Sequence, residues 1–294
     1  MNLQQLDEGL KRIINEEQGV SMELVEKTYD IYDTLVSSIK TNTNYQPCNI
    51  NGVRYKVGVF GYDNFFDSSI KIEYLYYNFF DKECFEKNYN SIRHICRVKN
   101  DTVLQITILA ISGTILKQKA LDELSHELEH LYQYTKANRI FATNQMYVNA
   151  IEIKRIAKRN TFEYCVADTI YLSRKFEQDA YLQSLYVKLM NCEFLESFET
   201  ILRESDIYNA LRALKTHLKD IECIGCLPKQ FQIRKYSYKK LVNDCKNAIK
   251  NIQWKMARVY NKAKADYRKE HCIEEKFSYT PKEDFKVKRD GKSY

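Results

Sequence analysis

The sequence predicts an α+β protein that is predominantly helical, with a small twisted sheet packed on one of its helices. Only 8 glycines and 3 prolines occur in 294 residues, far below the usual combined share of roughly 12%, and this scarcity favours long helices. Three segments, 53–59, 70–75 and 102–112, alternate apolar and polar residues with the period of two that is typical of strands. Because these segments are close in sequence and lie between helical patterns, we expect one sheet rather than many scattered strands.

The predicted elements follow the hydrophobic periodicity along the chain. Two amphipathic helices are expected within residues 1–45, with one apolar stripe over 6–14 and another over 25–36. Gly113 ends the strand at 102–112, and helices fill most of 116–221, since neither glycine nor proline occurs between Gly113 and Gly225. A further helix is predicted over 236–269, and an extended end over 280–294. The expected domains are N-terminal helices over 1–45, a core over 46–228 and a basic helical extension over 229–294.

Composition excludes several classes of protein. The chain has 44% apolar and 29% charged residues, and no apolar run is long enough for a membrane span, so no membrane association is expected. The first residues show neither the basic start nor the apolar stretch of a secretory signal. Nine cysteines, odd in number and without regular spacing, favour reduced thiols over disulfides. We therefore expect a cytoplasmic protein, located in the host cytoplasm or the virion if a phage encodes it.

The positive charge lies mainly at the C-terminal end. The net charge is +7, and residues 229–294 contain 19 Lys and Arg against 8 Asp and Glu. This region could bind nucleic acid or an acidic partner. It could equally be the solvated face of an ordinary packed helix, because interleaved basic and aromatic residues are not specific.

The chemically distinctive motif is His-Glu-x-x-His at 126–130. Residues i and i+4 of a helix lie one turn apart on the same face, so His126 and His130 can bind one ion. Glu127 flanks that face, where its carboxylate can take a proton from a metal-bound water. Leucines at 121, 124, 128 and 131 occupy the other side of the predicted helix and would turn the histidines away from the core.

The order of strand, short loop and helix over residues 102–136 resembles that of zincin metallopeptidases, and the resemblance extends over roughly 100–190. It implies a zincin-like core with Zn²⁺ bound by His126 and His130, and with Glu127 as general base. The metzincin extension is missing, because residues 133–139 contain neither glycine nor histidine. A glutamate on a later helix, as in gluzincins, is the remaining common third ligand.

Glu177 is the best candidate for that ligand. The Glu-x-x-Ala face formed with Ala180 is similar to that of small intracellular zincin domains of bacteria and phages. Tyr181 stands where longer gluzincin signatures have an aspartate, so the residue that would hydrogen-bond to a ligand histidine stays open among Glu123, Asp168 and Asp179. For the third ligand itself, Glu163, Asp168 and His217 remain alternatives.

The resemblance implies a zinc metallopeptidase that hydrolyses peptide bonds of a peptide or protein substrate through a metal-bound water activated by Glu127. Tyr134 and Tyr181 are candidates to assist in stabilising the oxyanion. An extended substrate would pair with the strand at 102–112, taken as the edge of the sheet. The alternative function is a non-catalytic interaction or phage virion protein with a zincin-like core, which binds nucleic acid or an acidic partner through residues 229–294. The sequence predicts neither an oligomeric state nor a cleavage preference.

Overall fold

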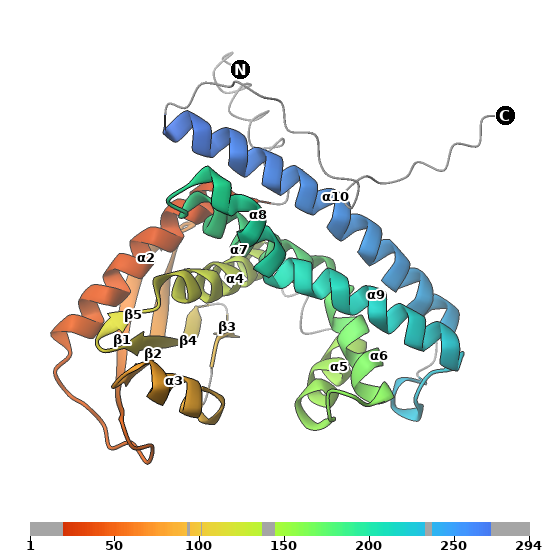
Figure 1. Ribbon diagram of the computed structural model, residues 1–294, viewed down its shortest axis with the longest axis horizontal. Helices are drawn as coiled ribbons and strands as arrows, with labels where there is room; N and C mark the ends of the chain where they lie inside the picture. Colours follow the sequence, from red (N-terminus) through yellow and green to blue (C-terminus); the bar gives the residue numbers. More distant parts are fainter. Residues whose placement is uncertain (1–19, 93–94, 101, 137–144, 233–236, 272–294) are drawn as a thin grey trace. The chain divides into compact units, whose positions relative to one another are not determined.

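The computed structural model describes residues 20–92, 95–100, 102–136, 145–232 and 237–271. In this part of the chain helices predominate and five strands form one mixed sheet, as Figure 1 shows. The predicted α+β class is thereby confirmed. Among the helices of these residues, none combines the length and the apolar character that crossing a bilayer requires.

The chain divides into two compact units. One, Ser21–Asn138, holds the sheet, and the other comprises Met1–Val20 and Arg139–Tyr294 and is helical in its described part. The division at 1–45, 46–228 and 229–294 remains a prediction. The helix predicted at 6–14 and the extended end predicted at 280–294 lie outside the described residues.

The sheet confirms the three predicted strands. Strands β1 and β2 form an antiparallel hairpin, β4 runs parallel to β2 and antiparallel to β3, and β5 pairs with the end of β4. The strands are β1 (Val53–Phe65), β2 (Ser68–Phe79), β3 (Arg97–Asn100), β4 (Val103–Ile111) and β5 (Thr114–Ile115).

The expectation that the strand at 102–112 forms the edge of the sheet is wrong at both ends of the strand, where β3 pairs with residues 103–105 and β5 with Ala110 and Ile111. Strand β4 lies between β2 and β3, so that β3 stands at that end of the strand order. Leu104 and Ile106 are buried on one face of β4, and Thr107 and Leu109 on the other are both 2% exposed. Both faces of β4 are therefore covered by packed side chains.

Strand β1 buries a different face from the one that its alternation suggests. Val57 and Val59 are 47% and 53% exposed, whereas Lys56 is only 7% exposed. The Lys56 ammonium donates hydrogen bonds to the carbonyl oxygens of Ile39 (3.1 Å) and Asn42 (2.6 Å). These carbonyls lie at the C-terminal end of helix α2 (Met22–Thr41), where the negative end of the helix dipole attracts a cation.

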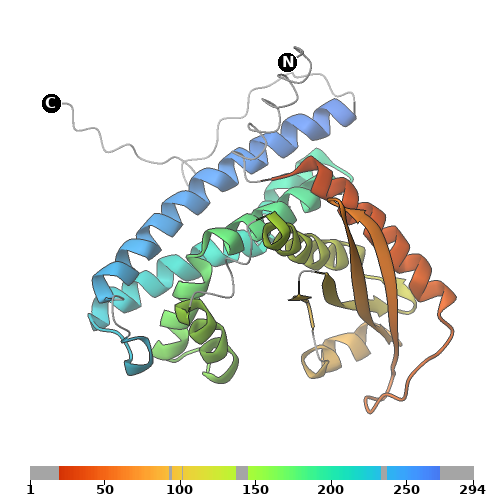
Figure 2. The ribbon, with the colours of Figure 1, turned by 180° about the vertical axis from the view of Figure 1, so that it is seen from behind.

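Two helices pack beside this sheet. Helix α2 (Met22–Thr41) begins at Ser21, whose hydroxyl oxygen accepts from the Leu24 amide, and it confirms the second predicted N-terminal helix. It contacts β1 and helix α4 (Lys117–Lys136), and Figure 2 shows it running beside the long strands. The short helix α3 (Lys82–Asn88) follows β2.

The helical unit confirms the predicted helices between residue 145 and Ile221, and the one at 236–269. Gly225 follows α9 with a positive φ of 72°, the left-handed conformation in which glycine commonly ends helices. Helix α10 packs against α7 and α9 through a stripe that includes Leu241, Ile252 and Met256. The helices are α5 (Gln145–Ile156), α6 (Phe162–Leu172), α7 (Lys175–Met190), α8 (Phe198–Glu204), α9 (Asp206–Ile224) and α10 (Tyr238–Glu270).

Candidate metal centre

Helix α4 carries the His-Glu-x-x-His motif on the side opposite its leucines. The four predicted leucines, at 121, 124, 128 and 131, are each 0% exposed. Burial of a leucine contributes about 2 kcal/mol, so this stripe fixes the rotation of α4 against α2 and β4, which it contacts. His126, Glu127 and His130 are all half-buried on the remaining surface.

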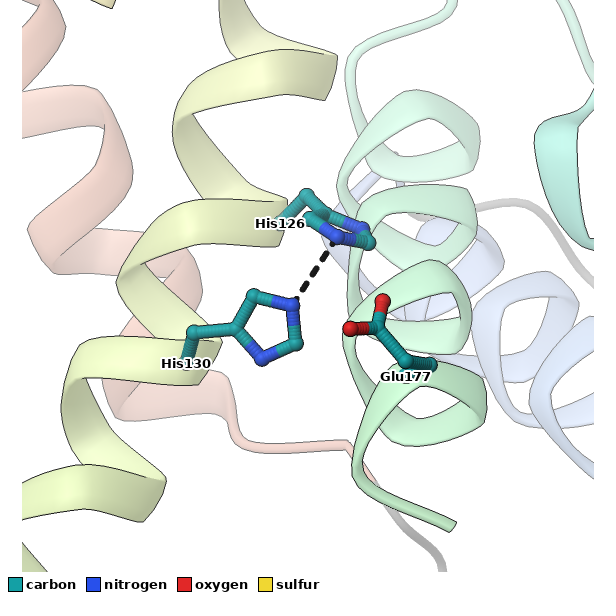
Figure 3. A group of neighbouring side chains, drawn as sticks. All are labelled: His126, His130 and Glu177. Atoms are coloured by element: carbon teal, nitrogen blue, oxygen red, sulfur yellow. Dashed lines mark hydrogen bonds between the residues drawn. The ribbon is translucent and has the colours of Figure 1, made fainter. Parts of the chain in front are cut away.

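The two imidazoles of α4 face each other, as the dashed line in Figure 3 indicates. Their Nε2 atoms lie 3.1 Å apart, and the rings are nearly perpendicular at 89°. Two nitrogens bound about 2.05 Å from one tetrahedral zinc ion would be separated by about 3.3 Å. At 3.1 Å at most one of the facing nitrogens carries a hydrogen. At least one lone pair therefore points into the space between the rings.

A glutamine orients His130 from behind. Nδ1 of His130 lies 3.4 Å from Oε1 of Gln133, whose amide nitrogen donates to Oε1 of Glu129 at 2.7 Å. An amide oxygen accepts hydrogen bonds, so this contact favours the tautomer with the hydrogen on Nδ1 and leaves the Nε2 lone pair for a cation. The sequence interpretation missed this chain of contacts, although spacings of three and four along α4 could have found it.

The candidate general base is held by the sheet. The backbone amide of Val98 in β3 donates to Oε2 of Glu127 at 3.1 Å. Cys96 lies close by, and burial together with the negative charges of Glu127 and Glu123 raises the pKa of its thiol well above the ordinary value. The neighbourhood of Glu127 therefore contains a neutral thiol and a fixed backbone donor.

In the helical unit, Glu177 lies in the first turn of α7 and is only 2% exposed. The hydroxyl of Tyr147 on α5 donates to its Oε1. Burial and the charge of Glu177 raise the pKa of Tyr171 on α6 and of Tyr181 on α7, so both phenols remain protonated at neutral pH. A buried carboxylate is costly without such donors. Sequence reasoning missed both Tyr147, which lies 30 residues from Glu177 along the chain, and Tyr171, which belongs to the preceding helix α6.

The rival acidic candidates have partners within their own units. Asp168 is paired with Lys154 (2.7 Å) and His217 (3.0 Å), and these partners occupy both carboxylate oxygens. Asp179 pairs with Lys255, and Glu123 with Lys119. Glu123, Asp168 and Asp179 are not the partner that orients His130, since Nδ1 of His130 contacts Gln133. Glu163 lies in the first turn of α6, where an acidic residue suits the helix N-terminus.

The predicted tyrosines have different settings. Tyr134 is half-buried on α4, one turn beyond His130. Tyr181 is held protonated mainly by burial, which raises its pKa, so its hydroxyl can donate a hydrogen bond. Assistance to an oxyanion remains a prediction for both.

The chemistry of the three predicted ligands fits a metal. His126, His130 and Glu177, drawn in Figure 3, offer two imidazole nitrogens and one carboxylate oxygen, donors that can hold an ion. Zinc takes this set in catalytic sites and keeps its fourth position for water or substrate. No protein family, curated protein or solved structure gives a significant match to this chain.

Proposed function

We propose that the chain is a zinc-dependent metallopeptidase in which His126, His130 and Glu177 bind the ion and Glu127 is the general base. The observation that carries this proposal is the pair of facing Nε2 atoms, 3.1 Å apart on α4. Two imidazoles on an ordinary solvated helix face gain little free energy from bringing their Nε2 atoms so close together. A shared cation, in contrast, would bind the lone pairs of both nitrogens.

The residues of α4 have distinct tasks in hydrolysis. A bound zinc ion supplies Lewis acidity, which polarises the scissile carbonyl and makes water acidic near neutral pH. Glu127 accepts the proton of the attacking water and then passes it to the leaving amine. The Val98 amide, 3.1 Å from Oε2 of Glu127, restrains the carboxylate so that little reorganisation precedes proton transfer.

The surrounding contacts keep the donors in position. Gln133 and Glu129 maintain the tautomer of His130, and the buried leucines of α4 fix the orientation of both imidazoles. The hydroxyls around Glu177, that of Tyr147 among them, hold its carboxylate in a defined rotamer in α7. Zinc binding through all three ligands then requires α4 and α7 to meet, which is part of the proposal.

The substitution Glu127→Gln tests the base directly. We expect it to retain zinc and to lower peptide hydrolysis by about 100-fold or more, because an amide cannot accept the proton. Zinc content is measured by elemental analysis, and cleavage by mass spectrometry of a mixed peptide library incubated with each variant.

Glu123→Gln is the matched control, since it makes the same chemical change one turn earlier in α4, in a residue that pairs with Lys119. It should leave both readouts nearly unchanged. Retained cleavage in Glu127→Gln would refute the role of the base. Wild-type protein that binds zinc but cleaves no peptide would refute the peptidase while leaving the metal site intact.

A second candidate function is binding of an anionic partner through α10. A pocket of about 590 Å³ lies along this helix, and its lining includes Arg174, Lys175, Lys240 and Trp254. Trp254 is 49% exposed, and the Arg258 guanidinium lies 4.4 Å from its ring centroid. Cationic side chains beside an exposed aromatic ring suit phosphates and stacked bases.

Because Trp254 is the only tryptophan of the chain, its fluorescence reports on this surface. Titration with a single-stranded oligonucleotide should change the emission with an affinity that falls steeply as salt rises. An emission that does not respond at low salt would rule out nucleic-acid binding at this surface.

A further inference from the structure

We infer that the helical unit contains a second zinc-binding site, formed by Cys165 of α6 and by His217 and Asp220 of α9. This inference concerns residues of one unit only, and it does not depend on the proposed peptidase activity.

Three different donor types converge at this place. One ligand atom of each residue, a sulfur, a ring nitrogen and a carboxylate oxygen, lies within 4.8 Å of the other two. Neighbouring donors around a tetrahedral zinc ion are about 3.3 to 3.6 Å apart. Donors that lie within 4.8 Å of one another can reach these separations by side-chain rotation within α6 and α9, which contact each other.

The histidine of this cluster is already oriented. Nε2 of His217 lies 3.0 Å from Oδ2 of Asp168. A hydrogen on Nε2 then leaves the Nδ1 lone pair for zinc, and the carboxylate behind the ring fixes its orientation. Lys154 lies 2.7 Å from the other oxygen of Asp168. Asp168 therefore belongs to the surroundings of the site rather than to the donor set.

The three proposed ligands differ in their exposure to solvent. Cys165 is 6% exposed and belongs to a hydrophobic cluster that includes Val166, Ile170 and Ile221. His217 is half-buried and Asp220 is exposed. An ion can enter from the side of Asp220, and water can occupy the fourth position.

Sulfur and nitrogen donors favour zinc over magnesium or calcium. Zinc binds cysteine as the thiolate, so binding at this site must release the thiol proton of Cys165 into solvent.

Cobalt provides the test, because Co²⁺ takes the place of Zn²⁺ and a thiolate ligand gives it a charge-transfer band in the near ultraviolet. The metal-free full chain is titrated with Co²⁺. We expect a thiolate band that Zn²⁺ abolishes, that persists in His126→Ala and that disappears in Cys165→Ala. Asp220→Asn, an exposed change that spares the core, should weaken Co²⁺ binding about 10-fold or more.

The controls address the exposed thiols Cys223 and Cys226, which follow the cluster in α9 and just beyond it. A variant with serine at both positions should keep the band. Three results would overturn the inference: no thiolate band in the wild-type chain at saturating Co²⁺, a band that survives in Cys165→Ala, or a band that is lost in the double serine variant. If Cys165→Ala does not fold, unchanged Co²⁺ affinity in Asp220→Asn overturns it instead.

Discussion

One ring nitrogen of His130, in the sheet-containing unit, contacts a neighbouring side chain, and the same is true of His217 in the helical unit. The nitrogen involved is Nδ1 in His130 and Nε2 in His217. His130 contacts a neutral amide, Gln133, through Nδ1, whereas His217 contacts a carboxylate, Asp168, through Nε2. The ring nitrogen that remains available for a metal ion therefore differs between the two histidines. In α4 it is Nε2, which faces a second imidazole, and in α9 it is Nδ1.

The contacts of the two histidines also differ in the sequence separation of the residues that make them. Every contact of His130 named above lies within one helix, at a spacing of three or four residues. The partner of His217 is 49 residues away, on another helix. A local arrangement survives small changes in tertiary packing, while the Asp168 pair depends on α6 and α9 remaining in contact. The two histidines should therefore respond differently to substitution.

The largest expected difference is in zinc binding and hydrolysis. His130→Ala should lower zinc affinity at the α4 site by about 100-fold or more, because it removes a direct ligand. Peptide hydrolysis should fall with it. His217→Ala, the matched change in α9, should leave hydrolysis of the peptide library unchanged in protein that remains folded. Loss of hydrolysis in His217→Ala, with activity kept in His130→Ala, would reverse the assignment of the two histidines.

The next difference is in stability and its dependence on pH. Burial by itself would raise the pKa of Asp168, but the hydrogen bond from His217 and the charge of Lys154 lower it on balance. A lowered folded-state pKa stabilises the fold above the unfolded pKa of about 3.9, and this contribution is lost as the pH falls through the folded value. Asp168→Asn should thus lower the free energy of unfolding by about 3 kcal/mol at pH 7.

Urea denaturation at pH 7 and near pH 3 measures this effect, since the gap between wild type and Asp168→Asn should narrow in acid. Glu123→Gln, which changes a partly exposed acid in the other unit, should cost less than about 1 kcal/mol. A gap of equal size at both pH values would contradict the assigned role of the Asp168 charge.

The smallest expected effect concerns the side chain behind each histidine, which is the amide of Gln133 for His130 and the carboxylate of Asp168 for His217. Gln133→Leu should weaken zinc binding at the α4 site about 10-fold, because Nδ1 of His130 loses its acceptor. Gln133→Glu should restore or increase the affinity by giving His130 the kind of partner that His217 has. Competition with a chelator of known affinity measures both variants. Equal affinities in the wild type and both variants would mean that Gln133 does not orient His130.

The sequence predicted the parts of the candidate site that depend on local spacing. The helix of α4, its buried leucines and the shared face of His126 and His130 all follow from a period of 3.6 residues. The strand at 102–112 was predicted as a strand but wrongly as an edge, because alternation shows burial of one face and not which strands lie beside it. The burial of Lys56 instead of Val57 likewise depends on the carbonyl groups at the end of α2.

The missed contacts join residues that are distant in sequence. No periodicity links Val98 to Glu127, or Tyr147 to Glu177, since each pair is brought together by the packing of separate elements. Gln133 is the exception, because a spacing of three residues from His130 within one helix could be predicted from the sequence, although its side chain is an amide rather than a carboxylate. Contacts that orient a ligand or a base can thus be predicted within one helix, but those between helices or strands require the fold.

The most direct test of the central claim is an anomalous scattering map at the zinc absorption edge, from crystals grown with zinc in excess over both proposed sites. The proposal predicts a peak within bonding distance of Nε2 of both His126 and His130, with the Glu177 carboxylate as the third protein ligand. A map without a peak between these two nitrogens, at full zinc occupancy elsewhere in the chain, would contradict it.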